Sequence, residues 1–346
     1  MRSRLRSLLR RRPRLSQAPE SGSGPAQGWE ASAQGMEPLT TEQITSGLAQ
    51  LSLQGRRVAV HSSLRSFGRV ADGPEGVIRA LQSQFSAILM PAFPGAANAL
   101  ASEPERPLQN GCDYAIHFDR VQPPPPFRIE SAPVPAKMGI ICQAFARSSG
   151  VARTNHPWHS WLGWGERVAE LLEPHPWDTT NPPLERLAEA DGWVLLLGVT
   201  LSACTAIHVA EERAGRRPFV RWAVHPDGSI RAVRVAGCAK GFDRLADLCR
   251  PLFREVNIGP CHVIAAPLRP LIELCAEAIR RDPEATKCSA TCLRCRDAAL
   301  GGPVLGSPPC PRTEKPTPYV VANPDSRPAQ LQSFQILVGG PRRVGS

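Results

Sequence analysis

The sequence predicts a mixed α/β domain, in which a largely parallel central sheet carries helices on both faces. The first observation is an apolar run from Val194 to Val199 that leads into a polar helix. Such a run is typical of a strand covered on both faces. The second is the order strand, turn, helix, strand between residues 57 and 90, a βαβ unit that implies a parallel pair with a right-handed crossover.

The elements follow in chain order. A helix is expected to begin at Thr41, because apolar side chains recur at helical spacing at Ile44, Leu48 and Leu51. Residues 91 to 137 are rich in proline and should form an irregular excursion over one end of the sheet. The other expected elements are strand Arg57–His61, helix Pro74–Gln84, strand Ala87–Met90, helix Met138–Ser148, helix Ala203–Arg213, a hairpin over Val220–Val235, helix Gly241–Phe253, strand Cys261–Ala265 and helix Arg269–Arg280.

The charge of the chain is concentrated in its first residues. The net charge is +10, and seven arginines lie among the first fourteen residues. Removing these seven from the 41 basic residues leaves 34 against 31 acidic ones, so nucleic-acid binding is not expected of the body. The composition predicts a disordered arm and linker over residues 1–38, a domain over 39–300 and a largely disordered tail rich in proline and glycine over 301–346.

Location and assembly are less defined by the sequence. The arginine-rich start resembles an organelle transit peptide in composition and equally fits a disordered arm. It lacks the apolar segment of a secretory signal, and no stretch is long enough to span a membrane. Together with eleven cysteines, this favours reduced thiols and a cytoplasmic protein. Whether the chain forms a homo-oligomer stays open.

An acid/base pair is expected on the helix after the central strand. Ser202 or Thr205 can cap this helix, and His208 and Glu211 then fall on one face. A strand-to-helix turn delivers its side chains to the crevice where α/β sheets bind ligands, so a carboxylate-held imidazole there could accept a proton. The alternative is an ordinary solvated helix face with one ion pair.

Histidines and cysteines elsewhere offer two possible metal sites. His156 and His159 form an HxxH pair, but no third ligand stands at a recognisable spacing, so buried packing among tryptophans is favoured. Cys288, Cys292 and Cys295 form a C-x3-C-x2-C cluster without a visible fourth ligand. Structural zinc is therefore the minority interpretation, and free thiols are the default.

Three ordered blocks resemble the aminoglycoside 3-N-acetyltransferases. They are HSSLRSFGRVADGPEGVIRAL with LMPAF, then MGIICQAFARSSGVARTNHPWHSW, then LLLGV with TAIHVAEE. The resemblance covers residues 40 to 297 and implies transfer of an acetyl group from acetyl-CoA to an amine by direct attack. It also implies an antibiotic-resistance activity.

The resemblance carries site residues with it. It implies that His208 is the base and Glu211 orients it, with His175 as a further catalytic candidate. The expected acetyl-CoA site consists of His61, Ser62, Ser63, Leu64, Ser66, Val70, Arg153 and His156. Arg128 and Lys240 stand where acidic residues are common in aminoglycoside-modifying members. Because a polycationic drug is attracted by carboxylates, the alternatives are a non-aminoglycoside biosynthetic amine or a catalytically idle binding protein.

Overall fold

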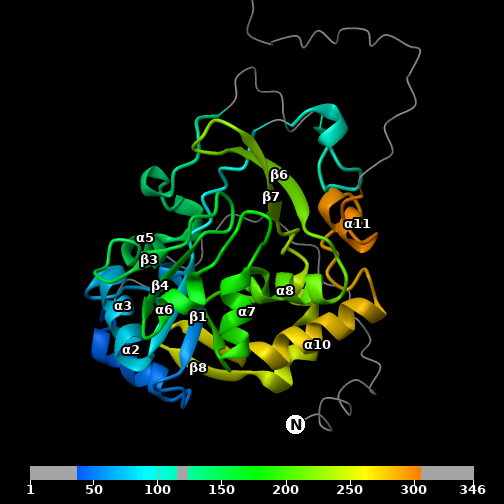
Figure 1. Ribbon diagram of the computed structural model, residues 1–346. Helices are drawn as coiled ribbons and strands as arrows, with labels where there is room; N and C mark the ends of the chain where they lie inside the picture. The colour runs from blue at the N-terminus through cyan, green and yellow to red at the C-terminus, as the bar shows by residue number, and fades with distance from the viewer. Residues whose placement is uncertain (1–36, 100, 115–123, 305–346) are drawn as a thin grey trace, which may run out of the picture. The chain divides into compact units, whose positions relative to one another are not determined.

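A seven-stranded sheet forms the centre of the domain in this computed structural model, which describes residues 37–99, 101–114 and 124–304 (Figure 1). The strand order is β3-β4-β2-β1-β5-β9-β8. These strands are β1 (Arg57–Ser62), β2 (Ala87–Pro91), β3 (Ala152–Arg153), β4 (Trp161–Gly165), β5 (Trp193–Leu197), β8 (Arg254–Ile258) and β9 (Cys261–Pro267).

Parallel pairing is confined to the middle of the sheet. Strand β1 runs parallel to both β2 and β5, which confirms the predicted βαβ unit. The outer pairs β2–β4, β3–β4, β5–β9 and β8–β9 are antiparallel. The mixed α/β class is confirmed, but the share of parallel pairing is smaller than predicted. For two of the antiparallel pairs the reason is the connection, because two residues join β8 to β9 and seven join β3 to β4, fewer than a parallel crossover needs.

Helices cover both faces of the sheet, as predicted. On one face lie α2 (Thr41–Ala49), α3 (Gly73–Gln84) and α5 (Ile140–Phe145). On the other lie α7 (Pro182–Glu189), α8 (Ala206–Arg213) and α10 (Leu268–Arg281). Alternation along β1 serves both layers, because Val58 and Val60 pack with the first group and Ala59 packs with the second. Figure 1 shows α2 and α3 well separated from α10.

Shorter helices complete the described part of the domain. The α-helices are α6 (Val168–Leu172), α9 (Ala246–Cys249) and α11 (Leu293–Ala299). The 3-10 helices are η1 (Leu64–Phe67), η2 (Glu103–Glu105), η3 (Ile129–Ser131), η4 (Ala136–Met138), η5 (Leu201–Ala203), η6 (Phe242–Leu245) and η7 (Arg250–Leu252). None of the helices in the described ranges is both long and apolar enough to cross a bilayer.

Several predicted helices are shorter than expected. The helix predicted over Met138–Ser148 is α5, since Gly139 has a φ of 87° and separates it from the preceding 3-10 turn. The helix predicted over Gly241–Phe253 is divided into η6, α9 and η7, where Pro251 cannot donate a backbone hydrogen bond. Thr205 stands at the N-cap of α8, but its side chain makes no capping hydrogen bond.

The predicted hairpin stands beside the sheet as β6 (Phe219–Val224) paired with β7 (Ile230–Val235). The described part of the irregular excursion packs against it: Ala99 N donates to Trp222 O at 2.9 Å, and Phe127 N donates to Val224 O at 2.7 Å. Of the predicted arm and tail, only residues 37–38 and 301–304 fall within the described ranges, so both predictions otherwise lie outside them.

Candidate functional site

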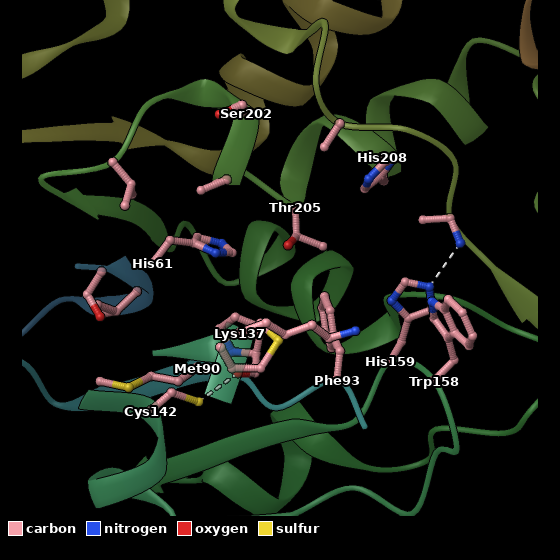
Figure 2. A pocket seen from close by; sticks show the side chains of 18 of the residues that line it. His61, Met90, Phe93, Lys137, Cys142, Trp158, His159, Ser202, Thr205 and His208 are labelled. Carbon is pink, nitrogen blue, oxygen red and sulfur yellow. Dashed lines mark hydrogen bonds between the residues drawn. The ribbon is translucent and has the colours of Figure 1, made fainter. Parts of the chain in front are cut away.

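A cavity of about 400 Å³ opens at the carboxyl ends of β1 and β5. These strands are parallel neighbours, with Ser62 opposite Leu197, so the segments that follow them emerge side by side. Figure 2 shows His61 and His208 on opposite sides of this space, with Thr205 between them in the view. The lining also includes Ser62, Met90, Phe93, Lys137, Met138, Cys142, Trp158, His159, Val199, Ser202, Ala236, Gly237 and Arg294.

His208 lies in the first turn of α8 and is hydrogen-bonded to the carboxylate of Glu211. Its Nδ1 stands 2.7 Å from Oε2 of Glu211, and the two residues are only 8% and 6% exposed. Because the carboxylate accepts the Nδ1 proton, the lone pair of Nε2 is free to act as a base. Within the described residues, no hydrogen bond to Nε2 is present. The predicted geometry of this helix face is confirmed.

The turn before α8 is held from a different part of the chain. Asp243 accepts hydrogen bonds from the Thr200 hydroxyl at 2.9 Å and from the Ser202 backbone N–H at 3.0 Å. The next residue toward the N-terminus, Phe242, meets the imidazole of His208 in an edge-to-face contact, with ring centroids 4.8 Å apart. These contacts fix both the start of the helix and the plane of the imidazole.

The second oxygen of Glu211 is also satisfied. Its Oε1 accepts hydrogen bonds from Nη1 of Arg216 and from the Thr286 hydroxyl, the latter at 3.3 Å. Arg216 donates further to the Thr286 hydroxyl at 2.7 Å and to Pro283 O at 2.6 Å. The guanidinium of Arg216 and the Thr286 hydroxyl thus hold the Glu211 carboxylate in place beside His208, where it can stabilise an imidazolium.

Two further imidazoles line the cavity. Burial lowers the pKa of His61 to about 4, and its Nε2 has no hydrogen-bond partner among the described residues. Burial also lowers the pKa of His159 well below its ordinary value, and its Nε2 accepts the Ala236 backbone N–H at 2.9 Å. Both rings are therefore neutral near pH 7. His159 was not expected at the site.

His156 and His175 have internal partners instead. The Nδ1 of His156 accepts the backbone N–H of His159 at 2.8 Å, and its Nε2 lies 3.1 Å from Thr179 O. His156 is thus buried and hydrogen-bonded, as the packing interpretation of the HxxH pair expects, whereas His159 lines the cavity. His175 stacks on His156, with ring centroids 4.6 Å apart, and its Nδ1 and Nε2 lie 3.0 Å from the Thr154 hydroxyl and 2.9 Å from Thr180 O.

Neither histidine is among the described residues that line the cavity of His208. Burial lowers the pKa of His156 to about 3 and that of His175 to about 4, so both rings are neutral. A catalytic role for His175 and an acetyl-CoA contact for His156 stay predictions, and this geometry gives both residues a structural task.

The predicted acetyl-CoA residues divide into two groups. His61 and Ser62 line the cavity, and Ser63 and Leu64 continue from them into η1. Ser66 turns away, because its hydroxyl donates to Ser63 O at 2.7 Å and lies 3.2 Å from the Cys261 Sγ. Val70 packs in the layer of α2 and α3.

Arg153 ties the irregular excursion to the sheet. Its guanidinium donates to Ala92 O at 2.9 Å, to Ala132 O at 2.6 Å and to the Ser160 hydroxyl at 3.0 Å. Each of its three nitrogens makes one of these bonds, and burial lowers its pKa. A direct contact between Arg153 and acetyl-CoA therefore stays a prediction without geometric support.

A second cavity, of about 320 Å³, carries carboxylates. Asp178, Glu185 and Glu212 line it together with Arg217 and Arg234. Glu212 also lines a small space beside His208, so the two regions share a wall. Burial raises the pKa of Glu212 to about 7, although a hydrogen bond from the Thr180 hydroxyl opposes this.

The cysteine cluster has a member that the sequence did not reveal. Cys238 joins Cys288, Cys292 and Cys295, and the four sulfurs lie within 4.8 Å of one another. The fold thus supplies the fourth thiol that was not visible in the sequence.

Comparison with known proteins identifies the family. The chain resembles the SPbeta prophage-derived aminoglycoside N(3')-acetyltransferase-like protein YokD of Bacillus subtilis, at 32% identity over 51% of this chain and 66% of the relative. It also resembles aminoglycoside N(3)-acetyltransferase III of Salmonella sp, at 30% identity over 54% of this chain and 64% of the relative. The matched region is thus slightly under two thirds of each relative's length.

The fold is shared with solved enzymes. The crystal structure of the apoenzyme of aminoglycoside acetyltransferase AAC(3)-IVa matches with a TM-score of 0.62 and 26% identity, over 78% of this chain and 100% of that one. A histidine-to-alanine mutant of AAC(3)-IVa in complex with a gentamicin matches with a TM-score of 0.60 and 25% identity, over 77% and 98%. The family model for aminoglycoside 3-N-acetyltransferases matches residues 59–280, and the chain belongs to that family.

Proposed function

We propose that the protein is an N-acetyltransferase, which moves an acetyl group from acetyl-CoA to the amine of an aminoglycoside-like small molecule. The observation that carries the proposal is one shared cavity. His61 and Ser62, at the end of β1 and among the residues expected to hold the donor, line the same space as His208, the expected base. The family named for this reaction supports the assignment.

The geometry suits direct attack on a thioester. An acceptor amine must be neutral to attack, and Nε2 of His208 can accept its proton while Glu211 stabilises the imidazolium. The amine nitrogen forms the new C–N bond at the thioester carbon while the carbonyl electron pair moves onto oxygen. The C–S bond breaks when this oxyanion collapses, and His208 returns the proton to the departing thiolate. The intermediate oxyanion needs hydrogen-bond donors, and the hydroxyl-bearing residues Ser202 and Thr205 line the same space.

The second cavity supports an aminoglycoside as the acceptor. Asp178, Glu185 and Glu212 line it and can accept hydrogen bonds from ammonium groups, although Arg217 and Arg234 line the same space. A gentamicin is the ligand in one solved relative, AAC(3)-IVa. A role in antibiotic resistance follows from this acceptor class.

A smaller, less cationic amine is the second candidate acceptor. The described lining of the His208 cavity carries the cationic side chains of Lys137 and Arg294 and no carboxylate. The coenzyme's phosphates would be attracted by these cations, whereas a polycationic acceptor would be repelled. This observation favours an acceptor that enters with a single amino group.

One assay separates these candidates. Purified protein is incubated with acetyl-CoA and either an aminoglycoside panel or a panel of simple monoamines, and thiol release is followed. If the carboxylate cavity holds an aminoglycoside, Glu185→Gln raises the aminoglycoside KM and leaves the KM for acetyl-CoA unchanged. Activity with monoamines alone would support the second candidate. A protein that does not bind acetyl-CoA in calorimetry would be an idle relative and would overturn the proposal.

We also propose that the enzyme works in the cytoplasm, where acetyl-CoA and reduced thiols are both available. In support, the cysteines of the described residues are free thiols. Fractionation of cells that express the full chain, with immunodetection, tests this location.

A further inference from the structure

The four clustered cysteines come from two separate segments. Cys238 lies in the loop between β7 and η6, while Cys288 and Cys292 precede α11 and Cys295 lies in its first turn. The Sγ of Cys288 is 3.7 Å from that of Cys238 and 3.5 Å from that of Cys295. The fold thus brings together two thiols, Cys238 and Cys288, that are 50 residues apart in the sequence.

We propose that these four thiolates bind a structural zinc ion. Tetrahedral zinc with Zn–S bonds of about 2.3 Å places its sulfurs about 3.8 Å apart, close to the separations found here. The C-x3-C-x2-C spacing, joined in space by one distant thiolate, suits a zinc site with four cysteine ligands. Four protein ligands leave no open position, so the metal has no part in the acetyl transfer itself.

Neither a disulfide nor burial in the core explains the clustering of these four sulfurs as well as zinc binding does. A disulfide needs sulfurs about 2.05 Å apart, and the pairs here are at 3.5 Å or more. Burial in an apolar core does not account for the cluster either, because Cys238, Cys288 and Cys292 are only partly buried. Cys249 and Cys275 show the contrast: they are 3.5 Å apart in the core, but no third ligand joins them among the described residues.

A backbone group supports the charge on the sulfurs. The Cys288 N–H donates to the Sγ of Cys295 at 3.4 Å. Hydrogen bonds of this kind stabilise metal-bound thiolates.

The metal would hold together two segments that border the cavity of His208. Cys238 follows Ala236 and Gly237, which line this cavity. Cys288 lies two residues after Thr286, whose hydroxyl bonds Glu211. A zinc ion between the segments would fix both the cavity wall and the support of Glu211.

The first test is metal content. The full chain is expressed in zinc-supplemented medium, and zinc is measured by inductively coupled plasma mass spectrometry after gel filtration. We expect about one zinc per chain in the unmodified protein and in Cys112→Ser, a control cysteine outside the cluster. In Cys292→Ser we expect zinc to fall several-fold, together with a lower melting temperature.

A second test does not require a folded variant. The unmodified chain, stripped of metal with a chelator under reducing conditions, is titrated with cobalt(II) alone. Intense thiolate-to-cobalt and visible absorption bands that saturate at one equivalent, and that zinc removes, would support the site. Substoichiometric zinc after growth, with no thiolate-to-cobalt bands on titration, would overturn it. Neither readout depends on acetyl transfer, so failure here leaves the proposed function unaffected.

Discussion

Two histidine-bearing regions of the molecule use the same side chain differently. At the start of α8, His208 binds a carboxylate through one ring nitrogen and faces a cavity with its other side. Near β4, His175 and His156 are stacked, and both ring nitrogens of each are hydrogen-bonded to neighbouring protein groups. The difference teaches that a histidine is available for chemistry when one nitrogen remains uncommitted beside open space, whatever its neighbours in the sequence.

Replacing each histidine provides the strongest test of this comparison. We expect His208→Ala to lower kcat/KM for acetyl transfer by about 10²–10⁴, the usual worth of a general base. The control is His175→Asn, for which we expect kcat per folded molecule within a few-fold of the unmodified enzyme and a lower free energy of unfolding, by about 1–3 kcal/mol, because buried hydrogen bonds are lost. Thiol release and urea unfolding provide the two measurements.

The assignment of the two roles would be wrong if His175→Asn lost acetyl transfer and His208→Ala lost only stability. A His175→Asn enzyme that keeps its stability but loses transfer would give His175 the catalytic role that the family resemblance implies. It would also show that the ring leaves its internal partners during turnover.

The carboxylate behind His208 allows a subtler test. Glu211→Gln keeps the shape of the side chain and removes its charge, so the imidazolium loses about 1.5–3 kcal/mol of charge-assisted hydrogen bonding. We expect kcat to fall roughly 10- to 100-fold, with the KM for acetyl-CoA nearly unchanged. Glu212→Gln is the matched neighbour, and a similar loss of kcat there would mean that Glu211 has no special part. Steady-state kinetics at saturating acetyl-CoA measures both.

His156 and His175 should make the free energy of unfolding depend on pH. Burial lowers the folded-state pKa values of His156 and His175 to about 3 and about 4, below the ordinary 6.5. Between these values the unfolded chain binds more protons than the folded one, so their contribution is complete above pH 6.5 and is lost as the pH falls towards 4. We expect a loss on the order of 1 kcal/mol per pH unit for each histidine.

Urea midpoints measured across pH 4–7 test this expectation. His175→Asn should lose stability less steeply than the unmodified protein as the pH falls. A parallel dependence in the two proteins would mean that this histidine is not held neutral by burial.

The smallest expected effect concerns the turn after β1. The Ser66 hydroxyl bonds Ser63 O rather than facing the cavity, so Ser66→Ala should lower the free energy of unfolding by about 1 kcal/mol. The KM for acetyl-CoA should stay the same. A KM several-fold higher, measured by thiol release, would place Ser66 at the donor and restore the prediction made from the resemblance.

Much of the fold was predictable because the central strands are covered on both faces. Strands β1, β2 and β5 contain continuous apolar runs, and such a run predicts a buried strand from the sequence alone. Strand β8 gave no such signal, since most of Arg254–Ile258 is exposed at the edge of the sheet. Strand β4 was also missed, because tryptophan and glycine alternate in Trp161–Gly165 and resemble a loop composition.

The site was predictable only where its geometry is local. His208 and Glu211 lie three residues apart on one helix, so helical spacing alone brings them together. Arg216 and Thr286, which complete the support of Glu211, are seventy residues apart, and Cys238 is fifty residues from Cys288. No periodicity in the sequence indicates contacts over such separations, so these partners could be identified only from the tertiary structure.

The contact of Arg216 with Pro283 and Thr286 has a consequence for biosynthesis. A ribosome delivers the N-terminal strands first, and a nascent chain arrested before residue 283 would hold His208 and Glu211 without the anchor that steadies them. Glu211 therefore gains its full set of hydrogen-bond partners only after residues 283 to 286 have left the exit tunnel.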